Sequence, residues 1–206
     1  MILTPIPRDQ LAAALDRFAA QLDDPAARAA FAQIRAMAPE RASGDVAEQH
    51  RQQAIAVARH IGVPVHHPGT HPPFNWDGTA LDGDTEAYVI LHEVAHFVLA
   101  PPERRRLIDF GLGPGPDTRA RIAAEHAALM PLLEREADEA EASLLGILWE
   151  AALGHPALAS FLDQNWLEGL ERSAAKHFGD VFGRLRRRGF AEAALPFEQA
   201  SRSTAL

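Results

Sequence analysis

The sequence of 206 residues contains no cysteine. This absence excludes disulfide bonds, thiolate nucleophiles and the zinc and iron–sulfur sites that cysteine ligates. Any metal ion that the protein binds must therefore be held by histidine, aspartate and glutamate, and the chain offers 10 histidines and 28 acidic residues for this purpose.

Long apolar runs are also missing. No stretch approaches the roughly 18 to 20 apolar residues that a helix needs to cross a bilayer. The first residues, Met1 to Pro5, show neither the basic region nor the apolar core of a signal peptide. We therefore expect a cytoplasmic protein without a membrane partner.

Positive charge is scarce, since 20 basic residues face 28 acidic ones and the formal net charge is -8. The acidic pI, near 5.6, gives the protein no general attraction to nucleic acid or to an anionic membrane. We expect no nucleic-acid partner, and the composition indicates nothing about the oligomeric state.

The remaining composition fits a soluble globular protein, with 47% hydrophobic and 23% charged residues. A chain of this length builds one substantial core. We interpret residues 1–206 as a single domain. Its four parts are N-terminal helices in 1–62, a site-lining loop in 63–84, a metal-site region in 85–165, and a C-terminal helix and tail in 166–206.

Apolar residues at helical spacing predict three N-terminal helices, so the expected fold class is mainly α. The first helix extends from Pro7 to Leu22. The second extends from Pro25 to Pro39, which ends it, and the third from Val46 to Ile61, where Gly62 ends it. The later helices are expected over Glu103–Phe110, around Ile122, through the acidic stretch from Glu125 into an apolar run that ends at Gly154, from Pro156 to Leu162, and from Trp166 to Leu185.

Residues 63–84 are rich in proline and glycine and break the helical rhythm. A long irregular segment inside a domain is either functional or disordered, and its Phe74 and Trp76 favour an ordered loop that lines the site. A short strand or β-hairpin around 63–67 or 79–81 would make the fold a metallopeptidase-like α+β variant of the helical domain. The loop histidines, His66, His67 and His71, are more typical of surface or hydrogen-bonding groups than of metal ligands.

The most informative stretch is His92-Glu93-Val94-Ala95-His96, which lies in an apolar run that predicts a buried helix. Residues four apart share a helix face, so both imidazoles can reach one metal ion. Glu93 can then lie beside this ion and take a proton from a bound water. The pattern arises by chance in roughly 3% of chains of this composition, so the neighbouring sequence has to decide whether it marks a metal site. Together with the neighbouring sequence, the H-E-x-x-H pattern predicts a metal-dependent enzyme in which Glu93 is catalytic.

A third ligand is needed, because two histidines leave an octahedral or tetrahedral ion short of protein donors. The acidic cluster from Glu134 to Glu141 leads into an apolar helix that could pack against the motif helix. Most of these carboxylates are expected to be solvated, and one to point inward. Spacing leaves Glu134, Glu136 and Glu139 as alternatives.

The order of the two helices resembles that of gluzincin-type peptidases, in which H-E-x-x-H is followed by a helix carrying Glu-x-x-x-Asp. Glu134 and Asp138 fit this second spacing. The resemblance implies a zinc hydrolase with Glu93 as the general base.

A longer stretch resembles the elongation factor P hydroxylase family. His92 to Phe97 is similar to the family's H-E-x-x-H-W, residues 105–111 (Arg-Arg-Leu-Ile-Asp-Phe-Gly) to its R-R-x-L-x-D-F-G, and residues 116–119 (Pro-Asp-Thr-Arg) to its P-D-G-R turn. The match covers roughly residues 85–165. It departs from the family at Thr118, which replaces a glycine, and at residues 141–144, where the family has K-P-Q-A.

This second resemblance implies a mononuclear iron site made of His92, His96 and Glu139. The implied reaction is the O2-dependent hydroxylation of a modified lysine on elongation factor P, so the expected partner is a protein or peptide substrate such as a translation factor. In that chemistry Glu93 is a proton donor or supports the ligands. Asp109 and Arg106 are candidates either for supporting the ligands or for a salt-bridged scaffold role, and Asp138 is a further candidate for supporting the ligands.

Three hypotheses follow from the sequence. The favoured one is an iron-dependent monooxygenase that acts on a protein or peptide side chain. The alternative is a zinc metallopeptidase or hydrolase with Glu93 as general base. A helical binding protein without turnover is the third.

Overall fold

The computed structural model describes residues 6–115, 118–167 and 173–190. In these ranges the chain forms eight α-helices and two 3₁₀ turns, and no strand. The elements are α1 (Arg8–Ala20), α2 (Pro25–Arg35), α3 (Gly44–Ile61), α4 (Ala87–Leu99), η1 (Arg104–Arg106), η2 (Ile108–Gly111), α5 (Arg121–His126), α6 (Leu132–Leu153), α7 (Ala157–Asp163) and α8 (Ala174–Arg187). The predicted mainly α fold is therefore confirmed.

The three N-terminal helices begin and end where local chemistry requires. The side chain of Asp24 caps α2 by accepting a hydrogen bond from the Ala26 amide, and Pro25 occupies the first turn. Gly62 ends α3 in the left-handed conformation, with φ of 85°, which glycine adopts without steric cost. The periodicity of this region thus predicted both the helices and their approximate ends.

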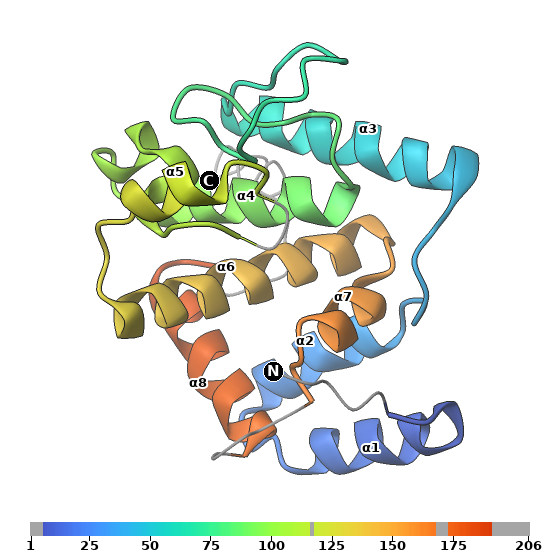
Figure 1. Ribbon diagram of the computed structural model, residues 1–206. Coiled ribbons are helices and arrows are strands. Elements are labelled where there is room, and N and C mark those ends of the chain that lie inside the picture. Colours follow the sequence, from blue (N-terminus) through green and yellow to red (C-terminus); the bar gives the residue numbers. More distant parts are fainter. Residues whose placement is uncertain (1–5, 116–117, 168–172, 191–206) are drawn as a thin grey trace, which may run out of the picture.

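Helix α4, which carries the H-E-x-x-H motif, packs between α3 and α6 (Figure 1). Eight of its 13 residues are buried, as expected for a helix that is covered on most sides. Gly146 of α6 brings the two backbones close together, because a Cβ atom there would lie 3.2 Å from the His92 Cα. This close packing holds the acidic beginning of α6 beside the motif.

A cluster of aromatic rings fills the core on the other side of α6. Phe18, Phe31, Phe161 and Phe178 come from α1, α2, α7 and α8, with ring centroids 4.6 to 6.1 Å apart. Edge-to-face and tilted pairs at these distances are favourable beyond their apolar burial. The cluster joins the four outer helices beneath α6.

The strand or β-hairpin predicted in residues 63–84, and with it the α+β variant, is not formed. Isolated bridges join Val65 to Leu81 and Trp76 to Leu81, and no ladder extends from them in the described residues. Pro64, Pro72 and Pro73 interrupt this segment and lack the amide hydrogen that a ladder requires.

Other departures lie after residue 100. The helix predicted over 103–110 is split into η1 and η2 at Leu107, which is extended, and within η2 Asp109 and Phe110 adopt left-handed φ angles of 42° and 54°. The acidic stretch starts a new helix only after Pro131, so α5 and α6 are separate. The C-terminal helix begins at Ala174, where the Ser173 hydroxyl accepts a hydrogen bond from the Lys176 amide, and Trp166 precedes it.

No helix in the described ranges combines the length and apolar character that spanning a membrane requires.

Candidate metal centre

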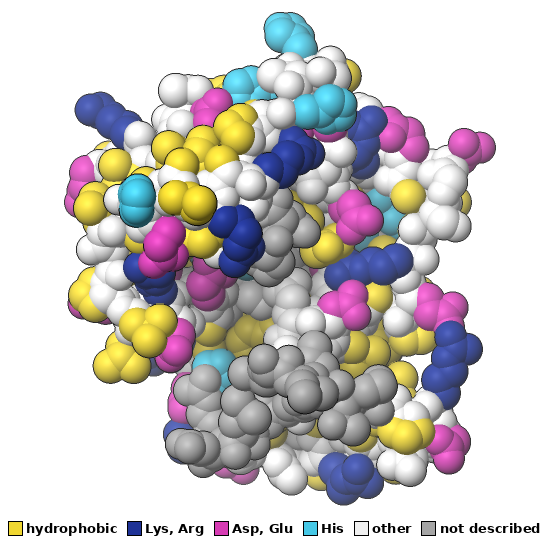
Figure 2. Space-filling model, in the orientation of Figure 1, with side chains coloured by type: hydrophobic (Ala, Val, Ile, Leu, Met, Phe, Trp, Pro, Cys, Tyr) yellow, Lys and Arg dark blue, Asp and Glu magenta, His cyan; other side chains and the backbone are white. Residues whose placement is uncertain are grey.

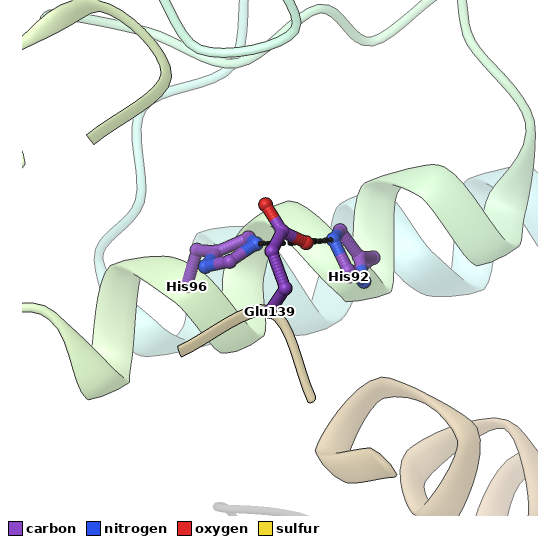
Figure 3. A group of neighbouring side chains, drawn as sticks. All are labelled: His92, His96 and Glu139. Carbon is purple, nitrogen blue, oxygen red and sulfur yellow. Dashed lines mark hydrogen bonds and ion pairs between the residues drawn. The ribbon is translucent and has the colours of Figure 1, made fainter. Parts of the chain in front are cut away.

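Three side chains from two helices meet in one group that could hold a metal ion (Figure 3). His92 and His96 lie one turn apart on α4, with their Nε2 atoms 3.0 Å apart. Glu139 reaches them from α6, and its Oε2 lies 3.3 Å from the His92 Nε2 and 3.4 Å from the His96 Nε2. The structure thus brings two of the motif's residues together with one of the three alternative carboxylates.

The size of this triangle suits a small divalent ion. A metal bonded at about 2.1 Å to three atoms that are 3.0 to 3.4 Å apart would see them at angles of about 90 to 110°. These angles cover those between neighbouring ligands in octahedral and tetrahedral complexes. Two imidazole nitrogens and one carboxylate oxygen are donors that both iron and zinc accept.

The charges of the group favour a cation among the three donors. Burial alone would lower the pKa of His96, but the carboxylates of Glu139 and Asp138 outweigh it and raise this pKa to about 10. Burial likewise opposes ionisation of Glu139, yet the two imidazoles hold the pKa of its carboxyl well below the usual range. A divalent ion at the same position would take over the role of the imidazole proton.

His96 is fixed by contacts on its other side. Its Nδ1 lies 3.2 Å from Asp138 Oδ2, and Oδ1 of the same carboxylate accepts a hydrogen bond of 2.9 Å from Arg104 Nη2. The ring of Phe110 stacks on the imidazole at a centroid distance of 5.5 Å. A carboxylate at Nδ1 sets the tautomer that leaves the Nε2 lone pair free for a metal.

Arg104 was missed by the sequence reasoning, which assigned the supporting role to Arg106. The Arg106 side chain is exposed, whereas Arg104 is mostly buried against Asp138. The only signal in the sequence was the run of three arginines at 104–106, and periodicity does not distinguish its members.

Glu93 lies buried next to the triangle. Its Oε1 accepts a hydrogen bond of 3.3 Å from the Asn75 amide, which comes from the proline-rich loop. Burial raises the pKa of the Glu93 carboxyl, although the imidazoles of His92 and His96 oppose this. The side chain therefore holds a proton closer to neutral pH than an exposed glutamate does.

A second buried acid, Asp109, lies near Glu93. Its Oδ2 accepts a 3.0 Å hydrogen bond from the Thr118 hydroxyl, and its Oδ1 accepts a longer one of 3.4 Å from the Trp76 amide. Burial, together with the charge of Glu93, raises the pKa of Asp109 to about 7. Thr118 belongs to the Pro-Asp-Thr-Arg turn, whose residues 116 and 117 lie outside the described ranges.

Access to the triangle is one-sided. The His96 side chain is 3% exposed, that of His92 is 21% exposed, and that of Glu139 is 48% exposed. The other two acids considered as ligands, Glu134 and Glu136, lie on the exposed surface of α6. Open ligand positions for water, O2 or a substrate would thus lie towards Glu139.

The loop histidines take other partners. His66 Nε2 lies 2.7 Å from Asp77 Oδ2, and His71 Nδ1 lies 3.5 Å from Asp84 Oδ2. His67 is exposed, and none of the three histidines belongs to the donor group. The loop reaches the site through Asn75 and Trp76 instead.

Comparison with known proteins gives no relative from which to transfer a function: no family model, no curated protein and no solved structure matches this chain.

Proposed function

We propose that this protein is a metal-dependent enzyme in which His92, His96 and Glu139 hold the ion. The observation that carries the proposal is the triangle of donor atoms, with edges of 3.0, 3.3 and 3.4 Å. Three protein donors leave further positions of the ion open, which is the arrangement of catalytic rather than structural sites.

The reaction that we favour is the O2-dependent hydroxylation of a side chain in a protein or peptide, with iron as the metal. Two histidines and one carboxylate with open positions are the donor set of non-haem iron(II) oxygenases. The Arg-Leu-Ile-Asp-Phe-Gly segment that resembles the elongation factor P hydroxylases packs against these donors, since Phe110 stacks on His96 and Asp109 lies near Glu93.

In this reaction a substrate C–H bond, O2, two electrons and two protons give a C–OH bond and one water, so an external two-electron reductant is consumed. Bound iron supplies the ability to activate O2. Burial raises the pKa of the Glu93 carboxyl, which suits this residue to the role of proton donor next to the ligands. Asn75 orients this carboxyl through its hydrogen bond, and the Asp138–Arg104 pair orients His96.

A zinc hydrolase is the second candidate, and it rests on the same donor set together with the position of Glu93. Two histidines and a glutamate also ligate catalytic zinc, where a neighbouring glutamate acts as general base on the bound water. The peptidase spacing that used Glu134 as the ligand is not reproduced, because the carboxylate that meets the two imidazoles is that of Glu139.

The first experiment measures the metal content of protein purified without added metal, by elemental analysis, in the parent and in two matched variants. Glu139→Ala should lose the metal, whereas Glu134→Ala, an exposed acid five residues earlier on the same helix, should retain it. Equal metal content in both variants would overturn the ligand assignment.

The second experiment identifies the reaction. Protein loaded with iron(II) is incubated with elongation factor P, O2 and ascorbate, and the mass gain of one oxygen atom is expected only when O2 is present. Stoichiometric zinc, with peptide cleavage that is lost in Glu93→Gln, would instead establish the hydrolase.

A further inference from the structure

A cavity lies where α3 and α4 begin and α6 ends, on one side of the molecule (Figure 1). Its volume of about 280 Å³ is roughly twice that of an engineered cavity that binds benzene, so it can hold a small organic molecule. Figure 2 shows acidic, basic and histidine side chains close together on this side of the molecule. His92, His96 and Glu139 do not line the cavity, which is therefore a candidate binding site separate from the metal centre.

Two hydrogen-bond acceptors are buried in the wall of the cavity. Glu150 is 2% exposed and His155 is 1% exposed. The His155 Nε2 lies 2.8 Å from the Gln53 Oε1, which only accepts, so the ring proton is on Nε2 and Nδ1 keeps its lone pair. This Nδ1 has no hydrogen-bond partner among the described residues. A buried acceptor without a donor is unusual in a folded protein and points to a donor supplied by a bound molecule.

The two arginines of the cavity wall are already paired with acids. Arg51 donates hydrogen bonds of 2.8 and 2.7 Å to Glu48. Arg41 donates hydrogen bonds of 3.2 and 3.0 Å to Asp163, which lies outside the cavity wall. The Arg41 Nη1 stays 3.7 Å from Glu150, beyond hydrogen-bonding distance. Glu150 therefore accepts no direct hydrogen bond from a cation in the described part of the chain.

The charge that remains in the cavity is negative. Glu86 lines it at the start of α4, is exposed, and forms no ion pair with other described residues. The histidines add no compensating charge, because burial lowers the pKa of His50 and, together with the nearby His50, lowers the pKa of His155 to about 4. Burial raises the pKa of Glu150 to about 7, so a cation beside this carboxyl would favour its ionised form.

Helix termini modify this charge only slightly. The first turns of α3 and α4 favour an anion, but Asp45 and Glu86 already lie at these ends. The last turn of α6, which contains Glu150, favours a cation. Both effects are screened by solvent and are weaker than a direct ion pair with a buried carboxylate. The cavity therefore favours a positively charged ligand that donates hydrogen bonds.

An organic cation fits the cavity better than a metal ion. A metal ion requires several donor atoms within a few ångströms of one another, and the group of this kind in the described residues is His92, His96 and Glu139. We propose that the cavity binds a small organic amine whose ammonium group forms an ion pair with Glu150. The proposal does not depend on the proposed function, because it involves none of the metal donors.

The test measures binding to the full-length protein at neutral pH by isothermal titration calorimetry. Three probes share a four-carbon backbone: 1,4-diaminobutane is cationic, 1,4-butanediol is neutral and succinate is anionic. The diamine should bind at least tenfold more tightly than either of the others. Equal affinity for all three, or no binding, overturns the proposal. Tightest binding of succinate also overturns it and would identify an anion site at the helix N-termini.

The variant Glu150→Gln keeps the shape of the side chain and removes its charge, so diamine binding should weaken at least tenfold. The matched control is Asp45→Asn, which makes the same change of charge at an exposed residue in the first turn of α3, outside the cavity wall. This control should bind the diamine like the parent. Equal weakening in the control would show a general attraction of the acidic protein for amines and overturn the location.

A second variant fills the cavity without changing its charge. Ala47 lines the cavity near the start of α3, and leucine at this position keeps a high helix propensity. Ala47→Leu should weaken diamine binding at least tenfold, whereas Ala56→Leu, at an exposed position of the same helix, should not. Urea unfolding checks that both variants are folded. Parent-like binding in Ala47→Leu overturns the proposal, whatever the stability of Glu150→Gln.

Discussion

Gly146 sets the distance between the two helices that carry the metal donors, and its replacement by alanine tests this directly. A Cβ atom there would lie 3.2 Å from the His92 Cα, 3.3 Å from the His92 amide nitrogen and 3.5 Å from the Leu91 carbonyl carbon. All three are backbone atoms of α4, which cannot rotate away. Because nonbonded carbons prefer separations of about 3.5 to 4.0 Å, α6 has to move outward by a few tenths of an ångström.

Two opposing effects determine the stability of Gly146→Ala. Alanine in place of a helical glycine stabilises the folded state by about 1 kcal/mol, whereas forcing a methyl group into a filled contact costs about 1 to 3 kcal/mol. The net free energy of unfolding should therefore fall by about 0 to 2 kcal/mol. Gly179→Ala in α8 is the matched control, since a Cβ at this position meets nothing within 4 Å and should give the stabilising effect alone.

The same outward movement should weaken metal binding. Gly146 lies two turns after Glu139 on the same face of α6, so displacing the helix at Gly146 moves the carboxylate away from the two imidazoles. We expect a loss of metal affinity on the order of tenfold, as for other changes around a ligand, and none in Gly179→Ala. Urea unfolding and calorimetric titration with metal measure the two quantities. Stabilisation of Gly146→Ala equal to that of the control, or unchanged metal affinity, would refute the reasoning.

Two further predictions concern buried acids. Asp138→Asn keeps the shape of the side chain beside the His96 Nδ1 but removes the charge that Arg104 also contacts, so metal affinity measured by calorimetry should fall about 10- to 100-fold. Glu136→Gln is the control and should bind metal like the parent. Equal metal affinity in the two variants would exclude a role of Asp138 in orienting His96. Burial raises the pKa of Glu150 to about 7 despite Arg41 at 3.7 Å, so the folded state holds a proton that the unfolded state releases near 4.5, and stability is lost as pH rises between these values. Between pH 4.5 and 8 the parent should lose up to about 3 kcal/mol of unfolding free energy in urea unfolding, and Glu150→Gln should not show this loss. An identical pH dependence of stability in both proteins would contradict the raised pKa of Glu150.

The helices that the sequence predicted well are those whose ends carry local chemistry. Asp24 with Pro25 starts α2, and the left-handed glycines at 62 and 154 end α3 and α6. These signals act within a few residues and can be read without tertiary structure. The helix predicted over 103–110 failed because its break depends on a distant contact, in which the Asp109 amide donates to the Trp76 carbonyl at 2.9 Å.

In the candidate metal centre, too, the residues recognised from the sequence are those related by local spacing, and the others depend on tertiary contacts. His92 and His96 could be recognised as a pair because both lie on one helix, four residues apart. The geometry that joins Glu139 to them depends on how α4 packs on α6, so spacing alone left it beside Glu134 and Glu136 as an alternative. Arg104 and Asn75 were missed because their roles depend on tertiary contacts with Asp138 and Glu93.

The protonation of Glu93 connects the structure of the site to the choice between the two reactions. Burial, with the charge of Glu139 adding to it, raises the pKa of the Glu93 carboxyl, and burial together with the charge of Glu93 raises the pKa of Asp109 to about 7. A general base for hydrolysis must be ionised before the reaction, whereas a proton donor for O2 chemistry must be protonated. The raised pKa of Glu93 suits the proton donor that the proposed hydroxylase needs, whereas a cation held by His92, His96 and Glu139 would lower this pKa and suit a general base.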